Sequence, residues 1–454
     1  MDTRSTHLDV DREAGTQARM AVLDACLAVG LLLLLMFAVL AFGATQTWSS
    51  FVLEAGAAAL FVLWAVRQAA EGSITLEKNP LLIPLAVLGV LVTLQAFTRL
   101  SAYPFASRME WMRYAAYGML FLVSQHLFRR HRWRERVATA MATFGAVVAV
   151  LGIAQDLTAG GRIYWRVVAP ESGTTYGPYV YHGAYAGLME MLAPLALCLA
   201  LDRWRNGGQR LLLAFGGILM AGTIFLSRSR GGMIAFSVEI AVLAVLLARR
   251  EAGSHAAGKI AAATVAIAIL VGTLGSAQLA RQVQSLRTPF NARINGDRIT
   301  IAKDALRMFR DRPLAGWGLD VFPIAYPHYR SFSTTYFINE AHNDYAQLLV
   351  ETGAIGALAM LAFIVLLYRV ALANLRAQDT SARLLTLAAL TGCTGLLVHG
   401  VSDFNFHVPA NAAMFMVLAA MATAQSGRRR DRGESRFSSD ARTPFVDVSS
   451  SMMN

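Results

Sequence analysis

The sequence predicts an all-α polytopic membrane protein with about 12 transmembrane helices. Hydrophobic residues make up 56% of the chain and charged residues only 15%, which is more apolar than a soluble domain needs. The apolar residues occur in continuous blocks, each long enough to cross a bilayer as a helix. Because apolar and polar residues do not alternate within these blocks, the sequence excludes a transmembrane β-barrel.

The apolar blocks divide the chain into five parts. We expect an N-terminal tail at 1–24, spans 1–9 within 25–275, a large loop with amphipathic helices at 276–353, spans 10–12 within 354–425, and a disordered basic tail at 426–454. The first apolar run is too long for a typical signal-peptide core, so it is expected to remain as the first span. The spans are predicted at residues 25–43, 51–67, 81–98, 111–128, 137–157, 183–201, 211–226, 231–248, 260–275, 354–372, 384–401 and 409–425.

Several reactive side chains fall inside these spans. The spacing of the cysteines fits neither a disulfide framework nor a metal site, so we expect small buried hydrophobic residues and predict no bound metal and no cofactor. The acidic residues are expected to be paired within the bundle, because an isolated charge in a membrane is costly. These residues are Cys26, Cys198, Cys393, Glu54, Glu190 and Glu239.

The distribution of lysine and arginine predicts the orientation. Of 41 such residues, 25 fall on the side that carries both tails, 7 in the short loops of the other side, and 9 in the long segment 276–341. Long loops are exempt from the charge rule, so both termini are expected in the cytoplasm and the long loop outside. The net charge of +12 then reflects topology rather than nucleic-acid binding, although the tail "GRRRDRGESR" is basic enough to contact anionic lipid or RNA.

A transporter with twelve helices is the main alternative class. Transporters of the major facilitator type usually carry their long loop inside, between spans 6 and 7, whereas the link here is only "DRWRNGGQR". The loop at 67–80 also lacks the Gly-Asp-Arg-Gly type signature of such transporters. A large outer loop favours an active site on the outer face, but a non-enzymatic anion transporter lined by arginines and a histidine stays open.

The long loop contains a predicted amphipathic helix, "DRITIAKDALRMFRDRP" (297–313), which Pro313 ends. "AGWGLD" (315–320) predicts a turn that depends on its glycines. The helix either lies at the membrane interface against anionic lipid or covers an anionic substrate with sugar-like faces. Its predicted apolar side is Ile299, Ala302, Ala305, Leu306 and Phe309, and its basic side Arg298, Arg307, Arg310 and Arg312.

Two arginines stand at a membrane boundary that otherwise avoids positive charge. "LSRSRGG" (226–232) joins spans 7 and 8 and carries Arg228 and Arg230 beside two glycines. A guanidinium group suits phosphate oxygens, and the glycines suit a partner that approaches the backbone closely. Snorkelling of both side chains to lipid headgroups is the alternative. Asp403, flanked by His399 and His407, is expected to pair with an arginine.

His342 lies in the polar stretch "EAHNDYAQLLVETG" (340–353), directly before span 10. We expect it on a short amphipathic helix, with "GAIG" (353–356) bending the chain into the membrane. An imidazole has an unperturbed pKa of about 6.5, so a neutral ring can accept a proton from a hydroxyl near pH 7. His342 is therefore a candidate general base on the outer face.

These stretches resemble the O-antigen ligase and O-antigen polymerase superfamily of bacterial membrane glycosyltransferases. The resemblance covers about residues 30–425, and "FGATQTW" (42–48) and "YGPYVYHGAYAGLMEML" (176–192) are similar to weaker family stretches. Related proteins often have an Asn-Arg-Asn-His type cluster where this chain has Tyr181, His182, Gly183 and Ala184, so no role is carried over to these four positions. The most specific stretches are "HNDYAQLLVETGAIG", "SRSRGG", "DRITIAKDALRMFRDRPLAGWG" and "DFNFHVPAN".

The resemblance implies about twelve helices with a large periplasmic loop between spans 9 and 10, in the bacterial inner membrane. It also implies metal-independent transfer of a glycan from an undecaprenyl-diphosphate carrier. By motif alignment, Arg230 and Arg298 hold the diphosphate, with Arg228 as a neighbour, and His342 activates the acceptor. Asn343 and Asp403 are candidate supporting residues. Because the base acts on the incoming hydroxyl while the diphosphate leaves directly, we expect inversion at the anomeric carbon.

Three acceptors remain open. Lipid A-core would make the protein an O-antigen ligase, which is the first expectation. A lipid-linked glycan would make it an O-antigen or exopolysaccharide polymerase, and a protein hydroxyl a protein O-oligosaccharyltransferase. Ligases and polymerases share these motifs, so the residues do not separate them.

Overall fold

The computed structural model describes residues 3–72, 75–168, 175–248, 289–334, 337–377 and 379–425. Helices dominate these residues, and the only strands among them are the short antiparallel pair β1 (Arg162–Ile163) and β2 (Val167–Val168). The protein is an all-α polytopic membrane protein, which confirms the predicted fold class.

The helices of the bundle follow the predicted spans. Among the described residues, eight helices are long and apolar enough to cross a membrane, and two more are shorter but apolar. The predicted span at 260–275 lies outside the described residues, and the helix Pro104–Phe128 at the predicted span 111–128 is not among these ten, so the count of twelve stays a prediction. The helices that coincide with the other spans are α1 (Thr3–Leu40), α2 (Thr47–Ala70), α3 (Leu82–Phe97), α4 (Pro104–Phe128), α5 (His131–Thr158), α6 (His182–Ala200), α7 (Gly207–Leu226), α8 (Arg230–Ala248), α12 (Asp344–Ala377), α13 (Thr380–His399) and α14 (Pro409–Thr423).

The first helix is longer than the first predicted span. α1 begins at Thr3 and therefore extends through most of the predicted N-terminal tail, although its apolar part is Gln17–Leu40. The predicted basic tail at 426–454 lies outside the described residues.

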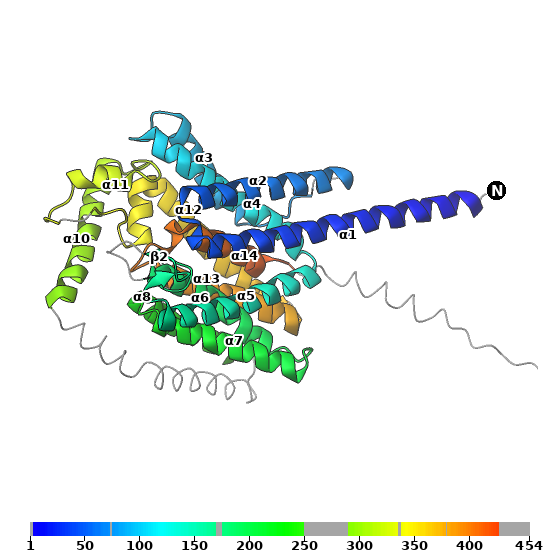
Figure 1. Ribbon diagram of the computed structural model, residues 1–454. Coiled ribbons are helices and arrows are strands. Elements are labelled where there is room, and N and C mark those ends of the chain that lie inside the picture. Colours follow the sequence, from blue (N-terminus) through cyan, green and yellow to red (C-terminus); the bar gives the residue numbers. More distant parts are fainter. Residues whose placement is uncertain are drawn as a thin grey trace, which may run out of the picture.

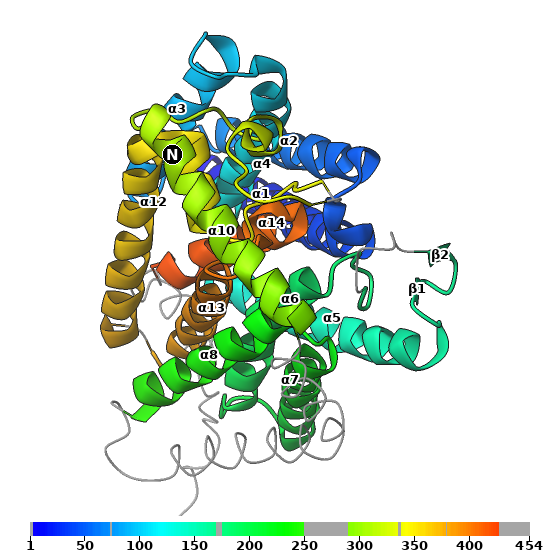
Figure 2. The same ribbon diagram turned by 90° about the vertical axis from the view of Figure 1, so that its left-hand side faces the viewer.

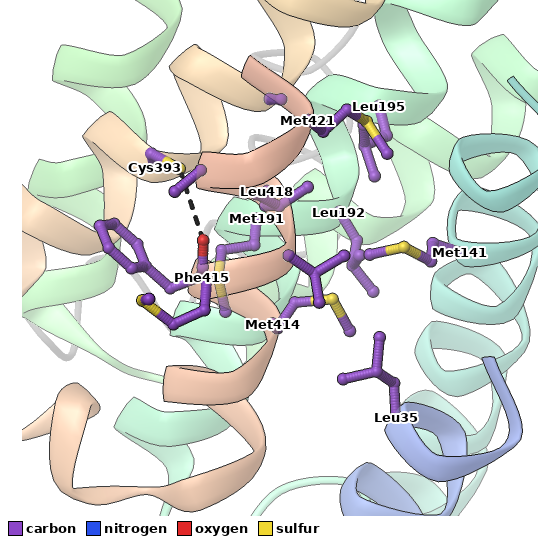
Figure 3. Packing of buried hydrophobic residues seen from close by; sticks show 14 of the residues in the cluster. Leu35, Met141, Met191, Leu192, Leu195, Cys393, Met414, Phe415, Leu418 and Met421 are labelled. Atoms are coloured by element: carbon purple, nitrogen blue, oxygen red, sulfur yellow. Dashed lines mark hydrogen bonds between the residues drawn. The ribbon is translucent and has the colours of Figure 1, made fainter. Parts of the chain in front are cut away.

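α6, α13 and α14 form the buried centre of the bundle. In the most apolar stretch of each helix, 94% of the residues of α6 and 83% of those of α13 are buried, compared with 28% for α12. Small residues allow these helices to approach closely. Gly392 of α13, for example, packs on the backbone of α6, where a Cβ would lie 2.8 Å from the Met191 carbonyl oxygen. Figure 3 shows side chains of this centre, including the contact of Cys393 Sγ with the Phe415 carbonyl at 4.0 Å.

The cysteines divide between centre and periphery. Cys198 and Cys393 are buried as expected, but Cys26 is exposed, so its expected burial was wrong. Cys26 lies on the outward side of the peripheral helix α1, at helical spacing from the exposed Val22, Val29 and Leu33.

One end of the bundle, opposite the N-terminal end of α1, carries α10 (Pro289–Asp311) and α11 (Phe322–Ala325) (Figure 1). We call it the loop end. α10 runs obliquely across it (Figure 2). The Ala102 N–H donates to the Trp317 carbonyl at 2.8 Å, and Arg298 Nη1 donates to the Ser402 carbonyl at 3.1 Å. These contacts join segments that the topology prediction placed on one side of the membrane.

α10 confirms the helix predicted at 297–313, although it begins earlier. It ends at Asp311, before Pro313. The predicted apolar side was partly wrong, because Ile299 and Leu306 are 60% and 50% exposed. The side that packs against α11 is instead centred on Ile301, Ala305 and Met308.

Hydrogen bonds explain which side of α10 is buried. Asp304 lies on the buried side and accepts a hydrogen bond from Tyr326 Oη at 3.1 Å and one from Ser331 Oγ at 2.9 Å. Burying this carboxylate requires such partners. The face of α10 that carries Asp304 is therefore the one that packs against Tyr326 and Ser331.

The two glycine-bearing turns predicted near span 10 meet each other. α12 is interrupted at Gly353, which has φ 63° and ψ −165°, so the predicted bend is confirmed. Gly316 has φ 71°, and a Cβ on either glycine would overlap the backbone of the other segment. The Trp317 N–H donates to the Val350 carbonyl at 2.9 Å, which ties the two segments together.

Candidate active site

His342 lies directly before α12 rather than on a helix, which corrects the predicted position. It has φ 51°, in the left-handed region that residues other than glycine adopt infrequently. Asn343 caps α12 by accepting the Ala346 N–H at 2.9 Å, and its Nδ2 donates to the Val401 carbonyl at 2.9 Å. Asn343 therefore fixes the His342 turn against the hairpin that follows α13.

Asp403 is the centre of a group of side chains at the loop end. His342 Nδ1 lies 3.7 Å from Asp403 Oδ1, and His399 Nε2 lies 3.5 Å from Oδ2. Tyr181 Oη donates to Oδ2 at 2.9 Å. Burial opposes ionisation of this carboxyl, but hydrogen bonds and charge from the two histidines outweigh burial and hold the pKa of Asp403 well below its usual range. Two histidines and a tyrosine, rather than the expected arginine, make these contacts.

The segment 181–184 belongs to this site. Tyr181 stacks on Phe404 with ring centroids 4.9 Å apart, and Phe404 meets the His342 ring edge-on at 5.0 Å. A Cβ on Gly183 would overlap the Asp403 carboxylate, so only glycine fits there. The resemblance assigned no role to these positions. Related proteins carry a polar cluster there, however, and that was the one indication in the sequence that the segment belongs to the site.

Arg298 reaches the same hairpin from α10. Its bond to the Ser402 carbonyl places the guanidinium group one residue from Asp403. Burial and Asp403 raise the pKa of Tyr181, and the nearby Arg298 partly offsets that rise. Arg298, Tyr181, Asp403 and His342 therefore share one site.

The short link before α8 carries Arg228 and Arg230 and meets this site at Gly231. Arg228 is exposed, with φ 65°, whereas Arg230 is half-buried at the first position of α8. A Cβ on Gly231 would lie 2.9 Å from His399 Nε2, and one on Gly232 would lie 3.0 Å from a Glu190 oxygen. The sequence predicted that a ligand would lie close to these glycines. In the structure, the buried side chains of His399 and Glu190 occupy that space instead.

The acids predicted to be paired within the bundle differ from one another. Glu190 lies 3.0 Å from His399 Nδ1, and Glu54 lies 3.7 Å from Arg113, so both are paired. Glu239 is fully buried, and neither of its carboxylate oxygens has a hydrogen-bond partner within the described part of the chain. Its expected pairing is therefore not found there.

An apolar cavity of about 610 Å³ lies between α3, α4, α12 and α14. Its lining is largely hydrophobic, with Leu88, Trp111 and Phe363 among the larger side chains. Asp344, Glu351 and His407 form a polar part of the wall, in which His407 Nδ1 lies 2.9 Å from Asp344 Oδ1. Because Asp344 is two residues from His342, the cavity borders the site.

The predicted site residues come together in part. His342, Asn343, Arg298 and Asp403 meet at the hairpin after α13, and Arg230 adjoins it through Gly231. No three His, Cys, Asp or Glu side chains in the described ranges are placed to hold a metal ion. The residues that sequence reasoning left without a role are Tyr181 and His399.

The bundle and its polar loop end define a multi-pass membrane protein with one histidine- and arginine-bearing site beside an apolar cavity. Residues 215–361 match the family described as O-antigen ligase, and this match supports the resemblance to the O-antigen ligase and polymerase superfamily on which the motif prediction rests. The matched segment contains Arg228, Arg230, Arg298 and His342. No curated protein matches the chain.

Proposed function

We propose that this protein is a metal-independent, inverting glycosyltransferase that moves a glycan from an undecaprenyl-diphosphate carrier to a hydroxyl acceptor. Lipid A-core is the first-choice acceptor, as in an O-antigen ligase. The observation that carries the proposal is the placement of His342 against Asp403, with Arg298 beside them, in a chain whose residues 215–361 match the O-antigen ligase family. The arginine distribution supports a loop end that faces the periplasm of a bacterial inner membrane, with both termini in the cytoplasm.

His342 acts as the general base. Its Nδ1 faces Asp403, which favours the tautomer with the proton on Nδ1 and leaves Nε2 as the acceptor. Nε2 takes the proton of the acceptor hydroxyl while that oxygen attacks the anomeric carbon. The 3.7 Å separation is longer than a hydrogen bond, and such contacts often tighten when substrate binds.

The arginines stabilise the leaving group. As the new glycosidic bond forms, the bond between the anomeric carbon and the diphosphate oxygen breaks, and undecaprenyl diphosphate leaves with the electron pair. Guanidinium groups of Arg298 and Arg230 neutralise its charge through paired hydrogen bonds to phosphate oxygens. A single displacement of this kind inverts the anomeric configuration.

The apolar cavity accepts part of the hydrocarbon chain of a lipid-linked substrate. It lies between helices of the bundle and opens at the bundle surface, and its polar part adjoins His342 through Asp344. Binding the chain there keeps the lipid in the membrane while its glycan reaches the loop end.

The test uses purified full-length protein with a metal chelator and a synthetic undecaprenyl-diphosphate oligosaccharide. Lipid A-core and a second lipid-linked oligosaccharide are offered in separate reactions. Glycan on lipid A-core is the expected result and identifies a ligase, whereas longer lipid-linked chains identify a polymerase. Transfer to neither acceptor by folded protein, or transfer only after metal is added, contradicts the proposal.

A further inference from the structure

A row of ionisable side chains continues from Asp403 into the bundle. His399 Nε2 lies 3.5 Å from Asp403 Oδ2, and His399 Nδ1 lies 3.0 Å from Glu190 Oε1. The His399 and Glu190 side chains are 0% exposed and that of Asp403 is 5% exposed. The row therefore connects α6 and α13 with the hairpin that holds the proposed base.

The packing around this row leaves the His399 ring no room to turn away. Gly231 and Gly232 of α8 lie against the ring and against Glu190, where any larger residue would displace one of them. Ser229 Oγ lies 3.4 Å from His399 Nε2. Glycines at these positions are thus explained by the buried histidine and its carboxylate partner.

The two carboxylates beside the His399 ring also indicate which of its nitrogens carry hydrogens. Glu190 has His399 as its hydrogen-bond partner, and buried carboxylates require a partner. An ionised Asp403 carboxylate can only accept hydrogen bonds, and its Oδ2 lies 3.5 Å from His399 Nε2. A hydrogen on Nε2 is therefore the arrangement that satisfies Asp403, with one further proton shared between Nδ1 and Glu190.

We propose that His399, held by Glu190, is a positioning residue that fixes the orientation and charge of the Asp403 carboxylate against His342. This inference rests on the proposed function, in which His342 is the base. A carboxylate that receives a hydrogen bond from His399 holds a proton on His342 less tightly than one without that donor. His399 therefore keeps His342 free to accept a proton at a lower pH.

Other charged and titratable groups also face Asp403 or its partners. The His126→Leu control and the His399→Gln variant separate their contribution to the pH profile from that of His399. These groups are Tyr181 and His182 at the start of α6, His342 and Asp344 at the start of α12, Arg298 from α10, Arg230 beside Gly231 at the start of α8, and Glu239 of α8, which faces Glu190.

The test compares kcat/KM for glycan transfer across pH in wild type, His399→Leu and His399→Gln. We expect His399→Leu to lower kcat/KM by about tenfold or more and to move the acidic limb of the profile to higher pH. His399→Gln retains an N–H donor and restores part of both. His126→Leu is the matched control, because His126 is a buried histidine 3.2 Å from Asp24 in the α1–α4 region away from the loop end.

An unchanged acidic limb in folded His399→Leu would overturn the inference, even if His342→Ala is inactive and the proposed function stands. If His399→Leu does not fold, Glu190→Gln decides, since it weakens His399 as a donor and should shift the limb in the same direction. Absence of transfer by wild type would overturn both proposals together.

Discussion

His342 Nδ1 lies 3.7 Å from Asp403 Oδ1, although one residue precedes α12 and the other follows α13. The hairpin after α13 is held in place by Asn343 and by the Asp344 N–H, which donates to the Gly400 carbonyl at 2.8 Å. The proposed base and its carboxylate partner are therefore positioned by the same short segment.

Replacing Asp403 by asparagine should lower the transfer rate. The amide keeps the size of the side chain but loses the charge that stabilises a protonated His342. We expect a loss of about 10²-fold to 10⁴-fold, the range for general-base catalysis, measured as kcat/KM. Asp311→Asn, on the exposed side of α10, is the control and should retain the wild-type rate. Equal rates for Asp403→Asn and wild type would remove Asp403 from the mechanism.

Replacing Gly353 by alanine should destabilise the protein. Its φ and ψ lie in a region used almost only by glycine, which costs other residues about 1–3 kcal/mol, and a Cβ there would overlap the Leu314 carbonyl. Thermal unfolding in detergent should show a lower Tm. Gly89→Ala is the control, because its Cβ meets no atom within 4 Å and alanine favours a helix by about 0.5–1 kcal/mol. A Tm for Gly353→Ala at or above that of wild type would contradict the close contact with Leu314.

The contribution of His407 to stability should depend on pH. Burial alone would lower its pKa, but the charge of Glu340 and the hydrogen bond to Asp344 raise the pKa well above its usual value. A pKa raised in the folded state gives stability that is complete below about pH 6.5 and is lost as pH rises through the raised pKa. The Tm difference between wild type and His407→Gln should therefore be largest below pH 6.5 and shrink at alkaline pH. A difference that grows with pH would contradict this sign.

Filling the apolar cavity should weaken binding of the lipid-linked substrate. Gly118 lines the cavity, and a Cβ there meets no atom within 4 Å, so Gly118→Leu places a side chain in the empty space. We expect a higher KM for the undecaprenyl-linked donor with little change in Tm. A donor with a short prenyl chain serves as the control and should be affected less. Equal effects on both donors would place the chain elsewhere.

The sequence predicted the helices well because their determinants are local. Continuous apolar blocks identified the described spans, and Gly353 identified the bend in α12. The contact between the segments of Gly316 and Gly353 was not predictable. Each glycine by itself predicts only a local turn, and the sequence does not show that the two turns meet. The exposed Ile299 and Leu306 show the same limit, since the buried side of α10 is determined by where the partners of Asp304 lie.

The site residues that lie in recognisable local motifs could be predicted from the sequence. His342, Arg298 and Arg230 were found through local stretches that resemble the superfamily. The roles of His399 and Tyr181 depend on partners more than 200 positions away, Glu190 for His399 and Asp403 for Tyr181, and a single sequence does not reveal such pairs. The position of His342 before the helix, rather than on it, follows from Asn343 capping α12.

The most direct test of the account is single-turnover glycan transfer by His342→Ala beside His328→Ala. His328 is an exposed histidine in the same loop end and serves as the matched control. We predict that His342→Ala still binds the lipid-linked donor but transfers its glycan about 10²-fold to 10⁴-fold more slowly, while His328→Ala matches wild type. Transfer at the wild-type rate by folded His342→Ala would contradict the role of His342 and with it the proposed site.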